Sequence, residues 1–199
     1  MLSPITAETY QALVFDAGML LYNFDFSTAT DASTLAALVK KAETRSASWL
    51  GATKGGVNIQ TNRTSWSPEF DYAGRNSYKG STRFSGAAPK MTGSLVEIRP
   101  ENLKIVSGSA DMKTNAKITT IQPMVDIPKD AYLDNVVWIG CVGEEGLCLV
   151  EMKNALCVNG INFQTADKNI GLLPFEFIGH QDGPENDDRL PVKYMFYKA

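Results

Sequence analysis

The 199-residue sequence has little of the chemistry on which enzymes most often rely. It holds one histidine, His180, and no apolar run that is long enough to cross a membrane as a helix. Its three cysteines, Cys141, Cys148 and Cys157, have spacings that match no zinc motif, so we interpret them as buried reduced thiols. We expect no signal peptide, because the N-terminus lacks a basic stretch before an apolar core.

Three patterns that could carry chemistry are incomplete. The glycine-rich residues 51–56 resemble a phosphate loop, but Val57 follows the last glycine where a Lys and then a Ser or Thr are needed. His180 has no clear nucleophile in a matching motif, and the acidic residues from Asp182 to Asp188 lack the spacing of an EF-hand loop. We therefore predict no catalytic residue, no cofactor and no metal site, and a protein that is not an enzyme.

Charge is distributed unevenly along a chain of otherwise ordinary composition. Its length and its 44% hydrophobic and 21% charged residues are typical of one globular domain. Residues 51–90 hold six basic and two acidic residues, net +4, which leaves 13 basic and 20 acidic residues elsewhere, net −7. Acidic residues gather at 126–151 and 182–188. Opposite charges on one chain favour head-to-tail self-association, although ordinary solvated faces give the same pattern.

The periodicity of apolar residues predicts a mainly β fold. A helix over residues 31–45 is indicated by the apolar stripe Leu35, Leu38, Val39 and Ala42. A second short helix begins at Pro100. Strands are expected from about residue 57 and at 19–24, 92–99, 117–122, 136–142, 147–152, 173–180 and 192–197. The fold class is therefore an antiparallel β-sandwich or barrel of about eight strands, with a flanking α-helix and a long inter-strand loop.

The long loop, residues 61–84, is the most unusual stretch. It is polar and basic, yet it carries several aromatic residues, which suggests that another molecule covers them. We predict that Gly51, Gly55 and Gly56 form a hinge at its base. Stacking of single-stranded nucleic acid on these aromatics is a weaker alternative, because the rest of the chain is acidic. The candidate contacts between subunits are Trp66, Phe70, Tyr72, Arg75, Tyr78, Lys79 and Arg83.

The order of several segments resembles the major tail tube proteins of tailed bacteriophages and prophages of Gram-positive hosts. The resemblance covers residues 20–197. It includes the glycine-rich entry to a strand at 50–57, the polar loop ending at Gly80 and the strand-to-helix step at 91–103. Later strands and the closing segment match at 134–140, 154–156 and 173–181. Arg99 stands where a capping Thr or Ser is usual, and the helix before the glycine-rich segment resembles an insertion.

This resemblance implies a structural virion protein with a single tail tube domain over residues 1–199. Residues 1–18 would form an N-terminal arm and residues 61–84 an assembly loop. Such subunits form hexameric rings that stack into a hollow tube, made in the host cytoplasm. The implied partners are the protein itself, a tape-measure protein, tail terminator and distal tail or baseplate proteins, and viral DNA passing without sequence-specific binding; no membrane is implied. The alternatives are the tube of a contractile injection or secretion particle and a β-sandwich domain that binds carbohydrate or nucleic acid.

Overall fold

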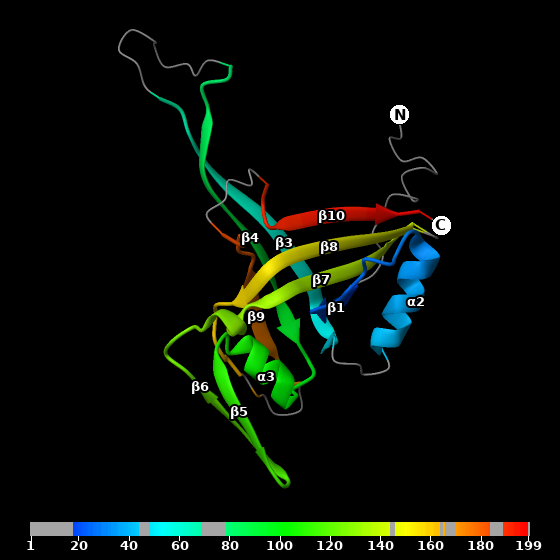
Figure 1. Ribbon diagram of the computed structural model, residues 1–199, viewed down its shortest axis with the longest axis vertical. Coiled ribbons are helices and arrows are strands. Elements are labelled where there is room, and N and C mark those ends of the chain that lie inside the picture. Colours follow the sequence, from blue (N-terminus) through cyan, green and yellow to red (C-terminus); the bar gives the residue numbers. More distant parts are fainter. Residues whose placement is uncertain are drawn as a thin grey trace, which may run out of the picture.

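The computed structural model describes residues 18–43, 48–68, 79–143, 146–163, 165, 170–183 and 189–198. Figure 1 shows the strands and helices in chain order. They are β1 (Met19–Tyr22), α2 (Ala32–Glu43), β2 (Trp49–Gly51), β3 (Thr53–Trp66), β4 (Arg83–Leu95), α3 (Pro100–Val106), β5 (Ala110–Asn115), β6 (Ile118–Pro123), the 3-10 turn η1 (Lys129–Ala131), β7 (Leu133–Val142), β8 (Gly146–Cys157), β9 (Leu173–Ile178) and β10 (Val192–Tyr197).

Eight of these strands form one antiparallel sheet, which confirms the predicted mainly β, antiparallel fold. The order along the sheet is β2-β1-β7-β8-β9-β4-β3, and β10 also pairs with β8. We call β2, β1, β7, β8 and β10 half A, and β9, β4 and β3 half B. Strands β5 and β6 form a separate two-stranded sheet.

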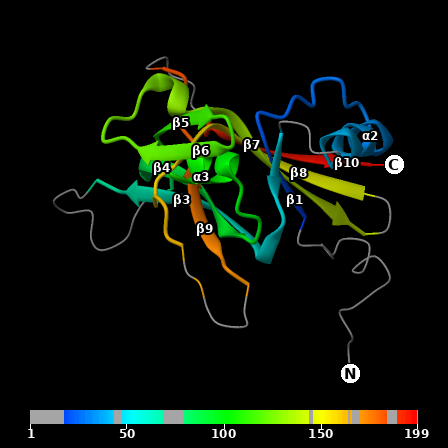
Figure 2. The same cartoon turned by 90° about the horizontal axis from the view of Figure 1, so that it is seen from below.

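The central strand β7 of half A is covered on both of its faces. On β7, Val136 and Trp138 point into a core shared with half B, whereas Val137 and Ile139 point towards α2. This alternation explains why β7 is apolar on both faces, as expected for a central strand. Helix α2 lies on one side of half A, as Figure 2 shows. Its predicted stripe is confirmed, with Leu35, Val39 and Ala42 buried and Leu38 partly buried.

The start of α2 shows why the helix begins where it does. The Asp31 side chain accepts hydrogen bonds from the Thr34 backbone N–H, at 2.8 Å, and from the Ser33 hydroxyl, also at 2.8 Å. A carboxylate at this position satisfies amides that have no partner within the helix. These bonds hold the pKa of Asp31 below its usual value. Residues 44–47 lie outside the described residues, so the predicted helix end at 45 is not placed.

Strand β8 joins the two halves. Its first part pairs with β7 and β10, and its last residues, Leu156 and Cys157, pair with β9. Close to this change of partner, Asn154 precedes Ala155, which still pairs with Leu133 of β7, and has a positive φ of 45°, which is uncommon for a residue other than glycine. Its side-chain amide donates to the His180 carbonyl at 3.1 Å and to Asp182 Oδ1 at 2.8 Å. Asn154 therefore marks the bend at which one strand passes from half A to half B.

The prediction of a loop over residues 61–84 is only partly correct. Residues 61–66 continue β3, and Arg83 and Phe84 begin β4. Strand β3 extends past its apolar residues, which are the usual sign of a strand in a sequence. It continues as a strand because its hydrogen bonds to β4 persist where neither face is buried. Strand β5 was not predicted, since its sequence is mostly polar and it is largely exposed.

Two hairpins project from opposite ends of the molecule. In Figure 1 the outer part of β3 and β4 extends from one end of the long axis, and the β5–β6 pair extends from the other. We call residues 61–68 and 79–88 the arm. The predicted N-terminal arm falls almost wholly on residues 1–17, which lie outside the described residues.

Candidate assembly surface

The arm is a two-stranded ribbon that extends beyond the packed body. Register pairs run from Thr61 opposite Pro89 out to Trp66 opposite Arg83, with a bulge between Thr64 and Ser65. The hydroxyls of Ser67 and Thr82 lie 3.1 Å apart just beyond the last pair. All the arm residues in strands β3 and β4 up to Gly86, apart from Thr61, are exposed. The ribbon is therefore held by its ladder of hydrogen bonds rather than by a core.

Aromatic side chains on the arm remain in contact with solvent. Trp66 is 54% exposed and Phe84 is 64% exposed. The guanidinium carbon of Arg63 lies 5.1 Å from the centre of the Phe84 ring, a cation–π arrangement. Trp66 and Arg83 are directly opposed in the register, so they share one face of the ribbon. Arg83 also donates from Nη1 to the Gly80 carbonyl at 2.7 Å, which orients its side chain at the arm tip.

The predicted contact residues fall into two groups. Trp66, Lys79 and Arg83 lie at the described end of the arm and are exposed, and Trp66 and Arg83 are register partners. The other four, Phe70, Tyr72, Arg75 and Tyr78, lie outside the described residues. A role for any of them in assembly remains a prediction.

The charged residues of β3, β4 and the described end of the arm are all basic. Within residues 53–66 and 79–95 there are five basic residues and no acidic one. Lys90 forms an ion pair with Glu176, at 2.7 Å. Among the described residues, the remaining four form no ion pair; they are Lys54, Arg63, Lys79 and Arg83. The described arm and the start of β3 therefore carry positive charge that no described carboxylate pairs with.

The predicted hinge glycines lie at the end of β2 and near the start of β3, and the part of β4 that pairs with β9 separates them from the arm. Gly51 ends β2 with φ at 119°, and Gly55 and Gly56 lie in β3 with φ at 85° and 76°. The register with β4 shifts between Thr53 and Val57, so Gly55 and Gly56 form a β-bulge, whereas Gly51 lies outside it. Their function as a hinge remains a prediction, since a bulge sets a bend without requiring movement.

A polar network holds Gly51 in place. Arg99 donates to the Trp49 carbonyl at 3.3 Å and pairs with Glu97, also at 3.3 Å. The buried Asn102 side chain donates to the Glu97 carbonyl at 2.9 Å. A Cβ atom at Gly51 would lie 3.3 Å from Glu97 Cβ. Arg99, which departs from the usual capping residue, thus connects the start of α3 to the strand before the arm.

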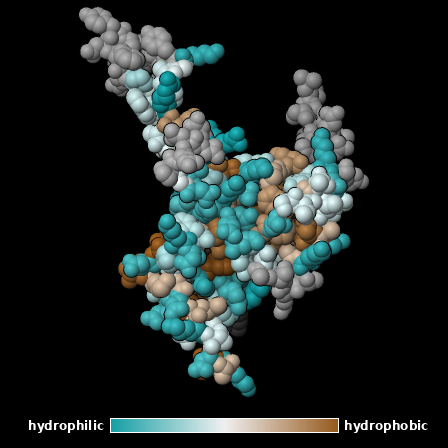
Figure 3. Space-filling model, viewed as in Figure 1, coloured by the Kyte–Doolittle hydropathy of each residue, from teal (hydrophilic) through white to brown (hydrophobic). Residues whose placement is uncertain are grey.

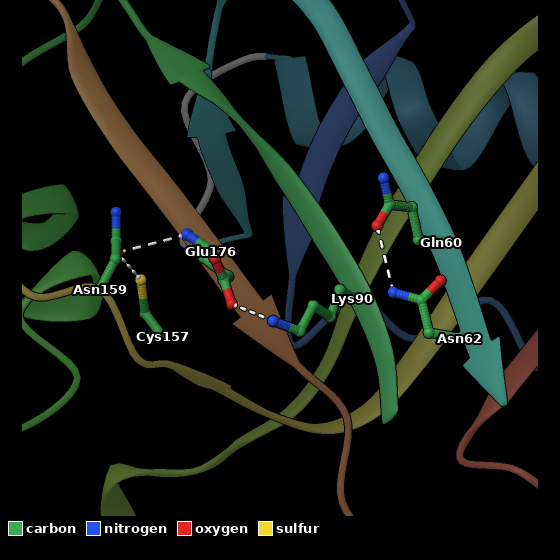
Figure 4. A network of polar contacts seen from close by, with 6 residues as sticks. All are labelled: Gln60, Asn62, Lys90, Cys157, Asn159 and Glu176. Atoms are coloured by element: carbon green, nitrogen blue, oxygen red, sulfur yellow. Dashed lines mark hydrogen bonds and ion pairs between the residues drawn. The ribbon is translucent and has the colours of Figure 1, made fainter. Parts of the chain in front are cut away.

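The outer face of half B is polar. Figure 4 shows Lys90 reaching Glu176 across β4 and β9, and the Asn62 amide donating to Gln60 Oε1 at 3.4 Å along β3. Asn159 Oδ1 accepts from the Glu176 backbone N–H at 3.3 Å and from the Cys157 thiol at 3.1 Å. This face therefore combines amides with a neutralised ion pair, in contrast to the apolar inner face that carries Phe175 and Phe177.

Strand β10 exposes aromatic side chains that we did not predict as contacts. Within the described residues it pairs only with β8, so its outer edge is open. Met195 and Tyr197 pack towards α2, whereas Tyr194 and Phe196 lie on the other face, with Phe196 70% exposed. The Tyr194 and Thr61 hydroxyls lie 2.9 Å apart, which connects β10 to the root of the arm. The alternation of aromatics at 194 and 196 is the signal that indicates this face.

A second exposed surface lies on the segment after β6. Met124, Val125 and Ile127 are exposed, and Val125 is 99% exposed. Residues 124–134 hold three aspartates and one lysine, net −2. The segment is fixed to the body, because the Met124 N–H donates to the Ser109 carbonyl at 3.0 Å and the Ser109 hydroxyl donates to the Asp126 carbonyl at 2.8 Å. It combines apolar and acidic character, where the arm is aromatic and basic.

A hollow of about 320 Å³ lies beside this segment. Its walls come from α3, the start of β5, η1 and the end of β1. The apolar lining includes Met112, Met124 and Leu133, and the charged groups at it are Glu101, Lys104 and Asp130. Burial and the Glu101 carboxylate raise the pKa of Tyr22 at its inner side, and Arg99 lowers it. We call this hollow together with residues 124–127 the basal surface.

Other candidate chemistry is accounted for by structural contacts. His180 Nδ1 lies 3.1 Å from the Asn154 carbonyl, and its ring packs edge-on against Tyr132 at 5.1 Å. None of the three cysteines forms a disulfide with another, and burial raises the pKa of Cys157 to about 11. Among the described residues no group of three His, Cys, Asp or Glu side chains is placed to hold a metal ion. In the same part of the chain, no helix has the length and apolar character of a membrane span.

The chain matches no protein family model and no curated protein. Among solved structures, it is similar to a chain from the tail of an empty GTA particle with C6 symmetry. The two share 5% sequence identity with a TM-score of 0.39, over 90% of this chain and 96% of the other. At this distance the likeness is too remote to carry an inference about function.

Proposed function

We propose that this chain is the subunit of a hollow tail tube, built from rings that stack head-to-tail. The observation that carries the proposal is the arm, which extends basic and aromatic side chains beyond a body that is otherwise acidic. A ribbon without a core of its own adds little to the stability of the fold, but its exposed side chains are suited to contact another copy. The ordered resemblance to tail tube proteins over residues 20–197 supports the same function.

Open strand edges support the formation of rings. In the described residues, β10 at half A and β3 at half B each have one unpaired edge. Exposed edges of this length are templates for pairing with another chain, and a closed ring removes them. Side-by-side copies would also cover the exposed aromatic face of β10. Six copies per ring is the number that the resemblance implies.

The polar outer face of half B suits the wall of a water-filled channel. Its amides need no apolar cover, and the Lys90–Glu176 pair leaves it without a strong local charge. A wall of this kind offers few fixed cations to the phosphate backbone, so DNA would pass without sequence-specific binding. In this proposal the tape-measure protein occupies the channel before DNA does, and tail terminator and distal tail proteins close its ends.

The proposed role is structural and belongs to the virion. In this proposal the chain catalyses no reaction, and its one histidine, His180, has a structural role through its contacts with the Asn154 carbonyl and the Tyr132 ring. The chain would be made in the host cytoplasm and would reach the particle by assembly.

Electron microscopy of the purified protein tests this proposal. At high concentration, or after seeding with tail tips, rings and hollow tubes are expected for the unchanged chain. A protein that stays monomeric under every condition, with a folded circular dichroism spectrum, would rule the proposal out. Ligand-dependent thermal stabilisation by an oligosaccharide or a single-stranded oligonucleotide would favour a binding domain instead.

An arm variant separates assembly from folding. Trp66→Ala combined with Tyr72→Ala is expected to leave the monomer folded and to impair stacking, because buried aromatics often dominate interface energies. Phe163→Ala is the matched control, since Phe163 is also an exposed aromatic, at 48%, but belongs to neither strand of the arm. Normal polymerisation of the arm variant would show that these side chains make no contact between rings.

A further inference from the structure

Trp66 and Arg83 form a compact pair at the described end of the arm. They oppose each other in the register, so an indole ring and a guanidinium project from one face of the ribbon. The indole is more than half exposed, and Arg83 has no carboxylate partner among the described residues. A surface pair of a large apolar ring and a cation is matched by a hollow that has an apolar floor and an acidic edge.

The basal surface has this composition. Met112, Met124 and Leu133 supply apolar lining, and the two carboxylates of Glu101 and Asp130 outnumber the one amine, of Lys104, at the same hollow. Its volume of about 320 Å³ accommodates an indole ring, and it falls within the roughly 300–1,000 Å³ common for binding pockets. The neighbouring Val125 and Ile127 leave apolar surface uncovered at its rim.

In Figure 1 the outer part of β3 and β4 extends away from α3 and β5, which line the hollow, so the described arm of one chain does not reach the hollow of the same chain. Figure 3 shows that the visible face is largely hydrophilic, with hydrophobic patches gathered on the body. The described residues of the chain leave Met124, Val125 and Ile127 of the basal surface exposed, so a second molecule can cover them. A second copy brings the complementary charge, with no acidic residue in the described arm against net −2 for residues 124–134.

We propose that the basal surface receives the arm tip of a second copy, with Trp66 of that copy in the hollow and its Arg83 beside Asp130. This inference depends on the proposed tube function and names the surface by which successive rings recognise each other. The contact joins unlike surfaces, so each copy keeps one free arm and one free hollow. Such a contact extends in one direction and adds rings without a built-in limit.

Disulfide trapping tests the proximity of the two surfaces. Trp66→Cys and Met124→Cys are introduced together in a Cys141→Ser background, because Cys141 is the one partly exposed thiol of the three. Oxidation of assembled particles is expected to give a ladder of covalent multimers. The matched control pairs Trp66→Cys with Lys40→Cys on the exposed side of α2, and it should give no ladder. Particles that assemble without a Trp66→Cys to Met124→Cys link, or that link equally in the control, would overturn the inference.

A charge exchange tests the ionic part of the contact. Arg83→Asp and Asp130→Arg are each expected to raise the protein concentration needed for half-maximal assembly by about tenfold or more. The double variant restores opposite charges and should recover most of the loss. If each single variant assembles normally, or if the double variant is worse than both, the arm does not dock beside Asp130.

The outcomes separate this inference from the proposed function. Tubes that form without cross-links at the basal surface leave the tube function intact and place the arm elsewhere. A chain that forms neither rings nor tubes removes both. Circular dichroism and thermal melts of each variant monomer show whether a loss of assembly reflects a loss of folding.

Discussion

Strand β7 and the arm use the same extended backbone in opposite surroundings. On β7, Val136 to Gly140 are buried because half B covers one face and α2 the other. On the arm, exposed side chains line both faces, and the ladder between β3 and β4 is the main internal contact. Burial stabilises the first strand at roughly 25 cal/mol per Å² of apolar surface, while the second keeps its apolar side chains in solvent. The arm therefore carries surface that the fold of one chain does not use.

The largest expected effect is on the free energy of unfolding, when one aromatic residue in each region is replaced by alanine. Phe177→Ala should lower the free energy of unfolding by about 3–5 kcal/mol, because Phe177 is 1% exposed and packs within the core between the halves. Phe84→Ala on the arm should cost less than about 1 kcal/mol, the range for an exposed cation–π contact. Urea unfolding of the two variant monomers measures both values. Equal costs would show that the arm is packed in solution.

Gly51, at the end of β2, and Gly55, near the start of β3, should differ in the stability that each loses on substitution. Gly51→Ala should cost about 1–3 kcal/mol, because a side chain is strained at its φ of 119° and a Cβ would also press against Glu97. Gly55→Ala should cost less, since nothing lies within 4 Å of the position of its Cβ and only the backbone is strained. Thermal melts compare the two. A greater loss at Gly55 would contradict the described bulge.

The buried thiol of Cys157 makes the stability of the core depend on pH. The pKa of Cys157 is raised from about 9.0 to about 11 by burial, so the unfolded chain loses this proton first as the pH rises. Stability from this thiol is complete below pH 9 and falls by about 1.4 kcal/mol at pH 10. Cys157→Ala should remove this part of the pH dependence, as measured by urea titrations at pH 8 and pH 10. An unchanged dependence in the variant would show that the thiol is accessible to water.

The smallest effect concerns the polar face of half B. Lys90 and Glu176 are each about one third exposed, at 34% and 30%, so solvent screens their ion pair. A double-mutant cycle with Lys90→Met and Glu176→Gln should give a coupling of about 0.2–1 kcal/mol, which weakens in 1 M salt. A coupling that exceeds this range and resists salt would mean that the pair is buried in the isolated chain.

Much of the fold follows from periodicity in the sequence. The apolar stripe of α2, the β7–β8 hairpin and the alternating Phe175 and Phe177 of β9 were predictable because each buries one or two regular faces. Pro100 likewise marked the start of α3, which is confirmed. In these elements the hydrophobic pattern and the tertiary contacts agree.

The arm and the basal surface were harder to predict for a physical reason. Strand residues 61–66 bury no face, so the polar sequence resembles a loop although its backbone pairs with β4. Strand β5 was missed on similar grounds. The hollow of the basal surface joins α3, β5, η1 and β1, which are distant in sequence, so no local pattern shows that Met124 and Leu133 meet. Charge counting nevertheless indicated opposite signs at the arm and in residues 126–151.

The way in which the arm is rooted in the body has a mechanical consequence. Strand β4 continues from the arm into half B, where its residues Lys90 to Leu95 pair with β9 from Ile178 to Leu173. A pull along the arm acts parallel to these strands, so the hydrogen bonds of that ladder are loaded in shear and must yield together. A pull across the arm would open them one after another, like a zip. The subunit is thus built to resist tension along the direction in which its arm extends.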